Sequence, residues 1–392
     1  MGGSTRSYEI ARGLVKLGYR VTIVTSLRDE QRCLLTSIEN IEGVCIHWIK
    51  VPYSNKMNFV RRLVSFVQFA LKSAILGRKI ESDIVYASST PLTVILPALF
   101  CSKVKKIPMI FEVRDLWPNI PIAMGVLKNR LLIYVAELLE MIAYNQASHI
   151  IALSPDMESF IIRKGIDTAK VTTIPNASDI SLFNMESKKS YNFRRELGID
   201  EEAVVILYAG TFGNVNGCSY IIELASKLRN LNIVKFVLIG EGKEKRSIIS
   251  RAKSLEVLGD NVFVLPQMSK NRMPYYFQKS DLIISTIINI TELEANSANK
   301  VFDGFAAGRG VLINHGGWIS DVLKSSNAGI QLSRKPDEAA VQLTDLVNDR
   351  GLLEEMGENA RKLAKTTFNR EKLTRKIGKI IASTLSPVTK SS

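Results

Sequence analysis

Hydrophobic and polar positions alternate along this chain with two periods. Short apolar runs of about four to eight residues, typical of strands buried on both faces, are separated by segments in which apolar residues recur every three or four positions, as in amphipathic helices. The first helix is expected over residues 4–17, ended by Gly18. Strands in the first half are expected at residues 20–25, 44–51, 83–88, 109–113, 150–153 and 171–174.

The same alternation begins again after a polar stretch at residues 184–192. Strands are expected at residues 204–209, 234–239, 262–265, 282–286, 311–314 and 329–332, with helical patterns between them. Strands that alternate with helices form parallel βαβ units, so each half predicts a doubly wound α/β domain. We place these domains at residues 1–187 and 188–368. A basic helix at residues 369–392 follows, and it can return to the first domain.

The first domain begins unusually, because no strand precedes Gly2. A doubly wound domain normally opens with a strand whose carboxyl end delivers a glycine-rich loop to the ligand. We therefore expect either that Met1 is an internal methionine of a longer natural protein or that the first sheet lacks its central strand.

Composition adds a strong positive charge to this picture. The 392 residues carry 52 Lys and Arg against 38 Asp and Glu, a net charge of +14. This indicates a polyanionic partner, which could be nucleic acid, a phosphorylated substrate or an anionic membrane. The four cysteines and three histidines are dispersed, so neither a disulfide framework nor a zinc site is expected. The sequence shows no signal peptide and no membrane span, and we expect a cytoplasmic protein.

The basic residues concentrate in one segment. From Lys50 to Lys79 there are seven Lys or Arg and no acidic residue. The same segment is amphipathic, with apolar positions at Phe59, Val60, Leu63, Val64, Val67, Leu71 and Ala74. A basic amphipathic helix is typical of proteins that lie on an anionic membrane surface, which predicts a peripheral protein on the inner face of the cytoplasmic membrane. The alternative is a helix whose apolar face packs into the core.

Residues 291–318 combine groups that hold phosphates and sugar hydroxyls. The candidates in this stretch are Glu292, Glu294, Lys300, Asp303, Gly316 and Gly317. Helix N-termini and a lysine favour anions, and carboxylates accept hydrogen bonds from vicinal diols. We therefore predict a nucleotide-sugar pocket here. A simple i,i+3 ion pair between Lys300 and Asp303 is the alternative.

Loops that contain glycine and precede helices give further candidates for phosphate binding. These residues are Gly2 and Gly3 before the first helix, and Gly210, Thr211, Gly213 and Asn214 after the strand at residues 204–209. Glycine lets the backbone approach a phosphate closely. The alternatives are a flexible terminus in the first case and an ordinary tight turn in the second.

Polar residues also follow the strand at residues 109–113, at the sheet edge where ligands bind. They are Glu112, Arg114 and Asp115, and a salt-bridged turn is the alternative. We take Asp115 as a catalytic candidate together with Lys300 and Glu294. Pro175 and Asn176 follow another strand end and give a weaker signal of the same kind.

No Asp-x-Asp motif occurs in the sequence. Transferases that hold a diphosphate through a divalent cation need clustered carboxylates. We therefore expect no metal, and we expect helix N-termini with lysine or arginine to stabilise a leaving diphosphate instead.

These segments resemble a known family, the GT-B glycosyltransferases of the retaining group 1 (family 4) type, and within it the fucosamine-transferase-like enzymes of bacterial surface-polysaccharide assembly. The resemblance covers essentially the whole chain and rests on MGGSTRSYEIARGLVKLGYRVTIVTS, FEVRDLWP, SHIIALSPDM, TIPNASD, YAGTFGNVNG and ANKVFDGFAAGRGVLINHGGW. It implies two Rossmann-like domains that face a cleft. It also implies that Gly2 and Gly3 lie beside the donor phosphates, that Lys300 reaches the diphosphate, and that Asp303 replaces the second glutamate of the family's Glu-x7-Glu motif on the ribose hydroxyls.

Two departures from the family pattern affect the site. The first motif glutamate would fall at Ala295, so Glu294 or Glu292 must replace it. The Arg/Lys pair that many relatives use for the diphosphate is missing at Asn214 and Gly217.

The resemblance implies transfer of a hexose or N-acetylaminosugar from a nucleotide-diphosphate sugar, with retention and without a cofactor. The acceptor would be a polyprenyl-diphosphate-linked glycan in O-antigen, capsule or exopolysaccharide synthesis. A sugar-nucleotide 2-epimerase also uses two such domains, but it needs a histidine in the cleft, which the sparse histidines disfavour. A nucleic-acid-binding or other polyanion-binding protein is disfavoured because the basic segments lack interleaved aromatic residues.

Overall fold

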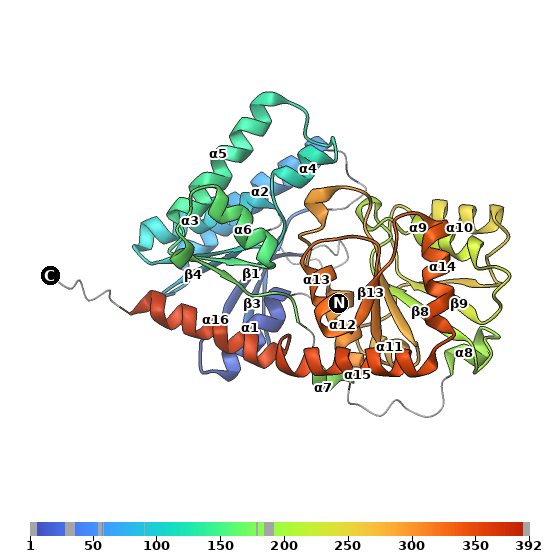
Figure 1. Ribbon diagram of the computed structural model, residues 1–392. Helices are drawn as coiled ribbons and strands as arrows, with labels where there is room; N and C mark the ends of the chain where they lie inside the picture. Colours follow the sequence, from blue (N-terminus) through green and yellow to red (C-terminus); the bar gives the residue numbers. More distant parts are fainter. Residues whose placement is uncertain are drawn as a thin grey trace. The chain divides into compact units, whose positions relative to one another are not determined.

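The computed structural model describes residues 6–27, 36–53, 57, 59–89, 91–177, 179–183 and 192–386. The chain folds into two compact units, shown in Figure 1. The N-terminal unit comprises Thr5–Pro175 and Glu371–Ser392, and the C-terminal unit comprises Asn176–Arg370. The boundary predicted at residue 187 lies outside the described residues.

The C-terminal unit is built around a six-stranded parallel sheet with the strand order β10-β9-β8-β11-β12-β13. The strands are β8 (Val204–Ala209), β9 (Val234–Ile239), β10 (Val262–Leu265), β11 (Leu282–Ser285), β12 (Gly310–Ile313) and β13 (Gly329–Gln331). The helices are α7 (Ile180–Phe183), α8 (Phe193–Glu196), α9 (Ser219–Lys227), α10 (Lys245–Ser254), α11 (Met273–Gln278), α12 (Asn299–Ala307), α13 (Trp318–Ser326), α14 (Pro336–Val347) and α15 (Arg350–Thr366). The strand order reverses between β8 and β11, which is the point where doubly wound sheets bind ligands.

Strand β8 shows why the apolar runs predict this sheet. Val204, Ile206 and Tyr208 enter the core under α9, α10 and α14, whereas Val205 and Leu207 enter the core under α12 and α15. All five side chains are fully buried. A parallel strand covered by helices on both faces needs apolar residues at every position, so the run VVILY is explained.

The N-terminal unit contains two sheets, with the strand orders β1-β3-β2 and β4-β5-β6-β7. Its strands are β1 (Thr22–Leu27), β2 (Thr36–Ile41), β3 (Val44–Lys50), β4 (Val85–Ser88), β5 (Met109–Val113), β6 (His149–Ala152) and β7 (Val171–Thr173). Its helices are α1 (Arg6–Lys16), α2 (Phe59–Lys79), α3 (Ile95–Lys105), α4 (Asn119–Ala123), α5 (Arg130–Gln146) and α6 (Pro155–Arg163). Among the described residues, no strand lies between β1 and β4 and pairs with both, so the two sheets are separate. The doubly wound α/β class and the predicted strands are confirmed in both units.

Strand β2 was not predicted. It pairs antiparallel with β3 through a turn at Glu42 and Gly43, whose φ angles are 50° and 83°. Two positive φ angles match the twist of a two-residue hairpin, and the side chain of Asn40 accepts a hydrogen bond from the Gly43 N–H at 3.1 Å. The strand escaped notice because its sequence, TSIENI, is mostly polar; the Glu-Gly pair was the available signal.

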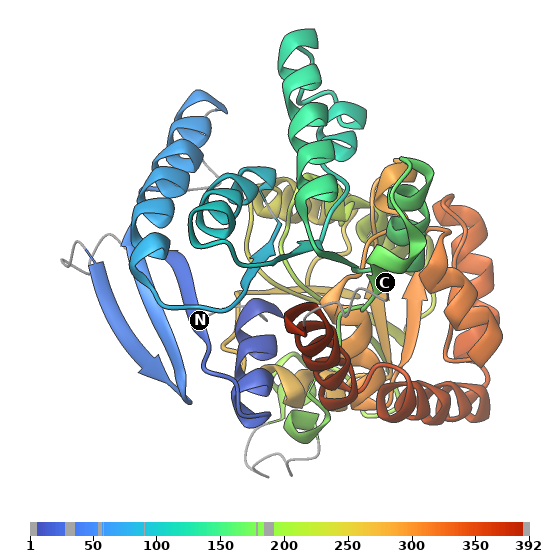
Figure 2. The same ribbon diagram turned by 90° about the vertical axis from the view of Figure 1, so that its left-hand side faces the viewer.

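The final helix, α16 (Arg370–Leu385), packs on α1 within the N-terminal unit, and Figure 2 shows the two helices side by side. The Tyr19 hydroxyl donates to the carbonyl of Gly378 at 3.0 Å. Gly13 faces Thr374 so closely that a Cβ there would lie 2.6 Å from the threonine methyl carbon. The backbone of α1 therefore lies directly against α16.

The amphipathic helix predicted from the basic segment exists as α2, but it is turned outward. Its buried positions include Ser65, Ala70 and Ser73, whereas Val64 and Leu71 of the predicted apolar face are exposed. The alternative of a core-packing apolar face is therefore wrong. Within the described residues, no helix has the length and apolar character needed to cross a membrane.

Candidate functional site

The loops after β8 and β9 meet at the carboxyl edge of the C-terminal sheet. Gly210 follows β8 and donates its N–H to the carbonyl of Ile239 at 3.0 Å. A Cβ at Gly240, just after β9, would lie 1.9 Å from the Gly210 carbonyl oxygen. Such a distance is sterically impossible, so glycine at 240 is what lets the two loops come together.

The predicted glycine loop at residues 210–214 is held from inside the unit. The Tyr208 hydroxyl and the Asn216 side-chain amide both donate to the Thr211 carbonyl, at 2.8 and 2.9 Å. Gly213 and Asn214 line a pocket of about 190 Å³ that lies between the first turns of α9 and α10. The loop is thus a rigid turn that has a cavity beside it.

Lys300, in the first turn of α12, reaches the start of the same loop. A Cβ on Gly210 would lie 3.2 Å from the Lys300 Nζ, and this Nζ lies 4.3 Å from the centroid of the Tyr208 ring. The side chain is only 9% exposed, and burial lowers the pKa of Lys300 to about 8, opposed by the Cys218 thiol. The Lys300 ammonium is thus buried against an aromatic ring, and an anion bound beside it would stabilise its charge.

Asp303 does not neutralise Lys300. It lies one turn further along α12, half-buried, and it is absent from the charges that act on Lys300. No ion pair between the two is found among the described residues, so the alternative of a simple i,i+3 pair is wrong. The role predicted for Asp303 on the ribose hydroxyls stays a prediction.

Glu294 lies beside the glycine pair that opens α13. A Cβ at Gly316 would be 3.1 Å from the Glu294 Oε2, and one at Gly317 would be 2.6 Å from its backbone carbonyl oxygen. Gly317 has a φ of 83°, which a side chain would strain. On its other side, Glu294 Oε1 pairs with Arg334 Nη2 at 2.6 Å, and both side chains are only partly exposed. The carboxylate is therefore fixed between a helix N-terminus and a guanidinium.

His315 lies in the middle of this group. It is fully buried, its Nδ1 lies 2.7 Å from the carbonyl oxygen of Gly316, and burial lowers its pKa. The charges that act on it belong to Glu294, Arg334 and Lys300. The charges of Lys300 and Glu294, two of the predicted catalytic residues, thus both act on this buried imidazole.

Sequence reasoning missed two members of this site, Arg334 and Tyr208. Arg334 follows β13, so the rule that ligands bind at the carboxyl ends of strands was the available signal. Tyr208 lies inside the apolar run of β8 and gave no signal. The other carboxylate of the predicted stretch, Glu292, is half-buried in the short 3-10 helix at Thr291–Leu293.

Three other predicted site residues are not placed in this group by the structure. Gly2 and Gly3 lie outside the described residues. Asp115 belongs to the N-terminal unit, where it is half-buried in the turn after β5. Their roles stay predictions.

Glu112, which the sequence placed beside Asp115 at the carboxyl end of β5, is a structural residue. It is completely buried, and its carboxylate accepts from Arg6 at 2.8 Å, from the Tyr86 hydroxyl at 2.7 Å and from the Ser88 hydroxyl at 2.6 Å. Burial acts to raise the pKa of Glu112, but Arg6 and Arg114 outweigh it and hold that pKa below its ordinary value. The oxygens of Glu112 are thus occupied by structural partners, and its ion pair is with Arg6 of α1 rather than within the turn that the sequence suggested.

Asn176 is structural as well. Its N–H donates to the Ser297 hydroxyl at 3.1 Å, and its side-chain amide donates to the Ser297 carbonyl at 2.5 Å. The residue is buried and fastens the start of the C-terminal unit to the loop that precedes α12.

The described residues contain no group of three or more His, Cys, Asp or Glu side chains that could hold a metal ion. The charged side chains described above at the carboxyl edge of the C-terminal sheet are Lys300, Arg334 and Glu294, and they lie near the N-terminus of α13.

Comparison with known proteins assigns both halves of the chain. Residues 1–177 match the family described as glycosyl transferase 4-like domain, and residues 190–363 match the family described as glycosyl transferases group 1. The lipopolysaccharide 1,2-N-acetylglucosaminetransferase of Salmonella typhimurium is 23% identical over 178 residues, which are 43% of this chain and 44% of that protein. The alignments span between 44% and 60% of the length of the curated relatives.

Solved structures resemble this one over nearly its full length. Sucrose-phosphate synthase from Thermosynechococcus elongatus superimposes with a TM-score of 0.76 at 14% identity, covering 97% of this chain and 93% of that chain. Anabaena HepE in complex with UDP-glucose superimposes with a TM-score of 0.73 at 16% identity, covering 98% and 97%. The retaining stereochemistry and the fucosamine-transferase-like branch stay predictions. Both halves of the chain thus match glycosyltransferase families, the glycosyl transferase 4-like domain in the first half and glycosyl transferases group 1 in the second, and the two-unit α/β architecture is the GT-B fold.

Proposed function

We propose that this chain transfers a hexose or N-acetylaminosugar from a nucleotide-diphosphate sugar to a polyprenyl-diphosphate-linked glycan, with retention and without a metal. The pathway would be O-antigen, capsule or exopolysaccharide synthesis. The observation that carries the proposal is the buried Lys300 ammonium, which lies beside the Gly210 backbone at the switch point of the C-terminal sheet.

The donor diphosphate is proposed to bind between Lys300 and the N-terminus of α13. Lys300 supplies a charge that no described ion pair neutralises, and the backbone N–H groups in the first turn of α13 favour an anion. Thr211, Gly213 and Asn214 border the same edge. A preorganised positive site of this kind stabilises the negative charge that develops on the leaving diphosphate. The complex of Anabaena HepE with UDP-glucose supports this choice of ligand.

Glu294 is proposed to serve in place of the first motif glutamate. Arg334 Nη2 pairs with Glu294 Oε1 at 2.6 Å and holds the Glu294 carboxylate beside Gly316. The carboxylate can therefore accept hydrogen bonds from hydroxyls of the donor sugar. Asp303 is proposed to bind the ribose, and Asp115 is proposed to contribute to catalysis from the N-terminal unit. Gly2 and Gly3 are proposed to lie beside the phosphates.

The proposed chemical step is a front-face displacement. The bond between the anomeric carbon and the leaving phosphate oxygen breaks, and the acceptor oxygen bonds to the same face of that carbon. The acceptor hydroxyl proton passes to the leaving phosphate. Configuration is retained because entry and departure share one face.

A thermal-shift panel tests the donor site. UDP-, GDP- and dTDP-sugars are added to the wild type, to Lys300→Met and Asp303→Ala, and to Lys253→Met as a control on an exposed lysine of α10. A ligand that binds only the folded state adds about 2.7 kcal/mol at a hundred times its dissociation constant. We expect one nucleotide class to stabilise the wild type and the control, and neither site variant. If no nucleotide sugar shifts the wild type, the proposal fails.

A further inference from the structure

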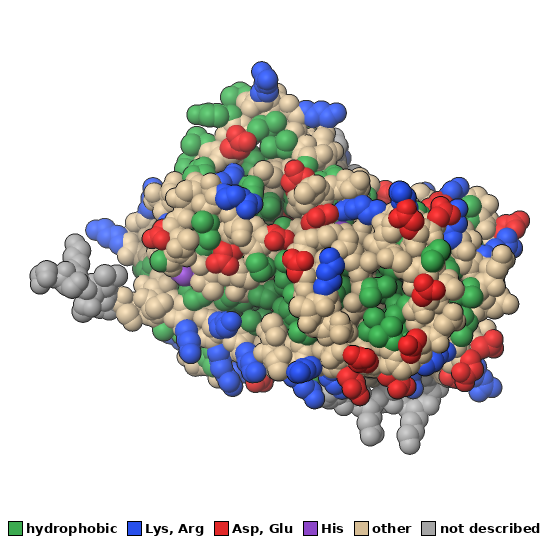
Figure 3. Space-filling view, in the orientation of Figure 1, with side chains coloured by type: hydrophobic (Ala, Val, Ile, Leu, Met, Phe, Trp, Pro, Cys, Tyr) green, Lys and Arg blue, Asp and Glu red, His purple; other side chains and the backbone are tan. Residues whose placement is uncertain are grey.

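An exposed apolar surface on the N-terminal unit has no role in the donor site. Among the described residues, the exposed large apolar side chains lie on α2, on α3, on α5 or in the turn before α5, apart from Leu17, Ile38, Val341 and Leu385. Helix α3 packs against both α2 and α5, so the three helices form one layer. Figure 3 shows apolar side chains gathered along α5.

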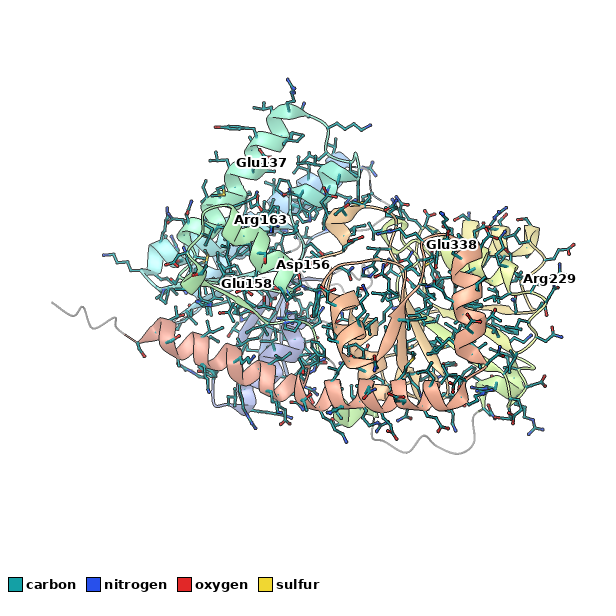
Figure 4. The ribbon with its side chains drawn as sticks, viewed as in Figure 1. Glu137, Asp156, Glu158, Arg163, Arg229 and Glu338 are labelled. Atoms are coloured by element: carbon teal, nitrogen blue, oxygen red, sulfur yellow. The ribbon has the colours of Figure 1, made fainter. Side chains whose placement is uncertain are left out.

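Helix α5 carries the clearest part of this surface. Leu131, Val135, Leu138 and Ile142 recur at the spacing of one helix face. They are 69%, 51%, 48% and 38% exposed, respectively. The neighbouring acidic side chain is Glu137, labelled in Figure 4, which lies off this stripe. The stripe thus presents about three turns of uncharged apolar surface.

The opposite face of α5 is buried and contains a charged residue. Glu140 is fully buried, the Tyr144 hydroxyl donates to it at 2.9 Å, and Lys164, just after α6, forms an ion pair with it. A helix on the surface of a water-soluble protein normally has the reverse arrangement, with its charged residues outward and its leucines inward. The ion pair therefore fixes α5 with its apolar stripe outward.

Helix α2 repeats this inversion. Ser65 and Ser73 lie on its buried face and satisfy their hydroxyls with backbone carbonyls, whereas Val60, Val64 and Leu71 are exposed. The same face pattern on two helices of one layer indicates a common apolar environment.

The charges around this layer identify its occupant. Basic side chains border it on all three helices or their connecting turns, at Arg61, Lys72, Arg78, Lys103, Lys128 and Arg130, and α2 contains no acidic residue. A second copy of the same surface would bring like charges together. An anionic lipid surface offers phosphates for the basic residues and acyl chains for the apolar stripe.

We propose that α5 is a membrane-inserting element, which lies in the interface of an anionic bilayer with its Leu131–Ile142 stripe among the acyl chains. Helix α2 supplies the electrostatic attraction. The inference rests on the polyprenyl-linked acceptor of the proposed function, since such a lipid lies in a membrane, and it adds the element of this chain that enters the lipid. The two helices should therefore differ in salt dependence, because attraction between charges is screened by salt and apolar insertion is not.

Vesicle flotation tests this division of roles. Phosphatidylcholine vesicles with and without phosphatidylglycerol are mixed with the wild type at low and high salt. The α5 variant is Leu131→Gln/Val135→Gln/Leu138→Gln, the α2 variant is Lys72→Gln/Arg78→Gln/Lys79→Gln, and Val341→Gln is the control on an exposed valine of α14. Matching circular dichroism spectra verify folding.

We expect the α5 variant to lose about tenfold or more in partitioning to anionic vesicles at both salt concentrations. The α2 variant should lose binding mainly at low salt, and Val341→Gln should bind as the wild type does. Wild-type binding by the α5 variant would overturn the inference. A second outcome would also overturn it. If light scattering shows a dimeric wild type and a monomeric α5 variant, and both bind vesicles equally, a second copy of the chain covers the stripe.

Nucleotide binding separates this inference from the proposed function. The α5 residues lie in the N-terminal unit and the donor residues in the C-terminal unit, so we expect the α5 variant to give the same thermal shift with the nucleotide sugar as the wild type. Vesicle binding that depends on α5 without any nucleotide binding would overturn only the proposed function. Nucleotide binding without any vesicle binding would overturn only the membrane inference.

Discussion

The Nζ of Lys300 lies 4.3 Å from the centroid of the Tyr208 ring. Tyr208 is the next-to-last residue of β8, and Lys300 is the second residue of α12. The π face attracts the cation but does not neutralise it. The charge thus stays available to an anion at the switch point of the C-terminal sheet.

The affinity for UDP should fall as the pH rises through about 8. Burial lowers the pKa of Lys300 to about 8, so the free protein loses the charge above this pH and must take up a proton to bind the diphosphate. The diphosphate itself is fully ionised above pH 7. We expect binding about tenfold weaker at pH 9 than at pH 7, measured by calorimetry.

Two variants check that Lys300 is the titrating group. Lys300→Met should bind UDP weakly and with no pH dependence in this range. Lys253→Met should keep the wild-type slope. An unchanged slope in Lys300→Met would assign the pH dependence to another residue.

Gly240→Ala should destabilise the C-terminal unit. The added Cβ would lie 1.9 Å from the Gly210 carbonyl oxygen, so the carboxyl ends of β8 and β9 must separate. We expect a loss of about 3 kcal/mol, measured by urea denaturation. Gly351→Ala on α15 is the matched control, because its Cβ meets nothing closer than 3.4 Å, and it should stabilise by about 0.5–1 kcal/mol. Equal effects of both changes would contradict the steric argument.

Arg6→Met should destabilise the N-terminal unit and reverse its acid response. In the wild type the pKa of Glu112 is lowered, so its ionisation stabilises the fold above the ordinary pKa and this contribution disappears as the pH falls. Without Arg6 a buried carboxylate loses its main partner, which costs about 3 kcal/mol at pH 7. The variant should then recover stability on acidification.

Hydrogen exchange of peptides from β4 to β7 at pH 7 and at lower pH measures this effect. Lys16→Met, an exposed change on the same helix, should alter neither stability nor its pH dependence. A loss in Arg6→Met that is independent of pH would show that the packing of the side chain matters more than its charge.

Lys164→Met should loosen α5. The change removes the ion pair and leaves the buried Glu140 carboxylate with its hydrogen bond from Tyr144. We expect the free energy of unfolding to fall by about 2 kcal/mol. This is less than for a fully buried pair, because Lys164 is partly exposed. The double variant Glu140→Gln/Lys164→Met should recover part of this loss, and Arg163→Met (Figure 4) should be silent. Thermal denaturation with hydrogen exchange in α5 measures all three.

The sequence by itself determined the strands and the class of the fold. Apolar runs such as VVILY in β8 are local patterns, and a strand covered on both faces needs them whatever its partners are. The sequence also predicted the start of α12, because Lys300 precedes a local amphipathic pattern that ends at Gly308. Local periodicity records burial along one element.

The tertiary structure alone decided which polar groups are already occupied. Glu112 resembled a ligand-binding carboxylate until Arg6, distant in sequence, was found to pair with it. Glu294 gained its fixed position from Arg334 on another strand end. Helix α5 is amphipathic in sequence, but only the exposure of its apolar stripe and the buried ion pair of Glu140 show that the stripe faces outward. Periodicity separates two faces of a helix without saying which is covered, because that depends on contacts between elements far apart in the chain.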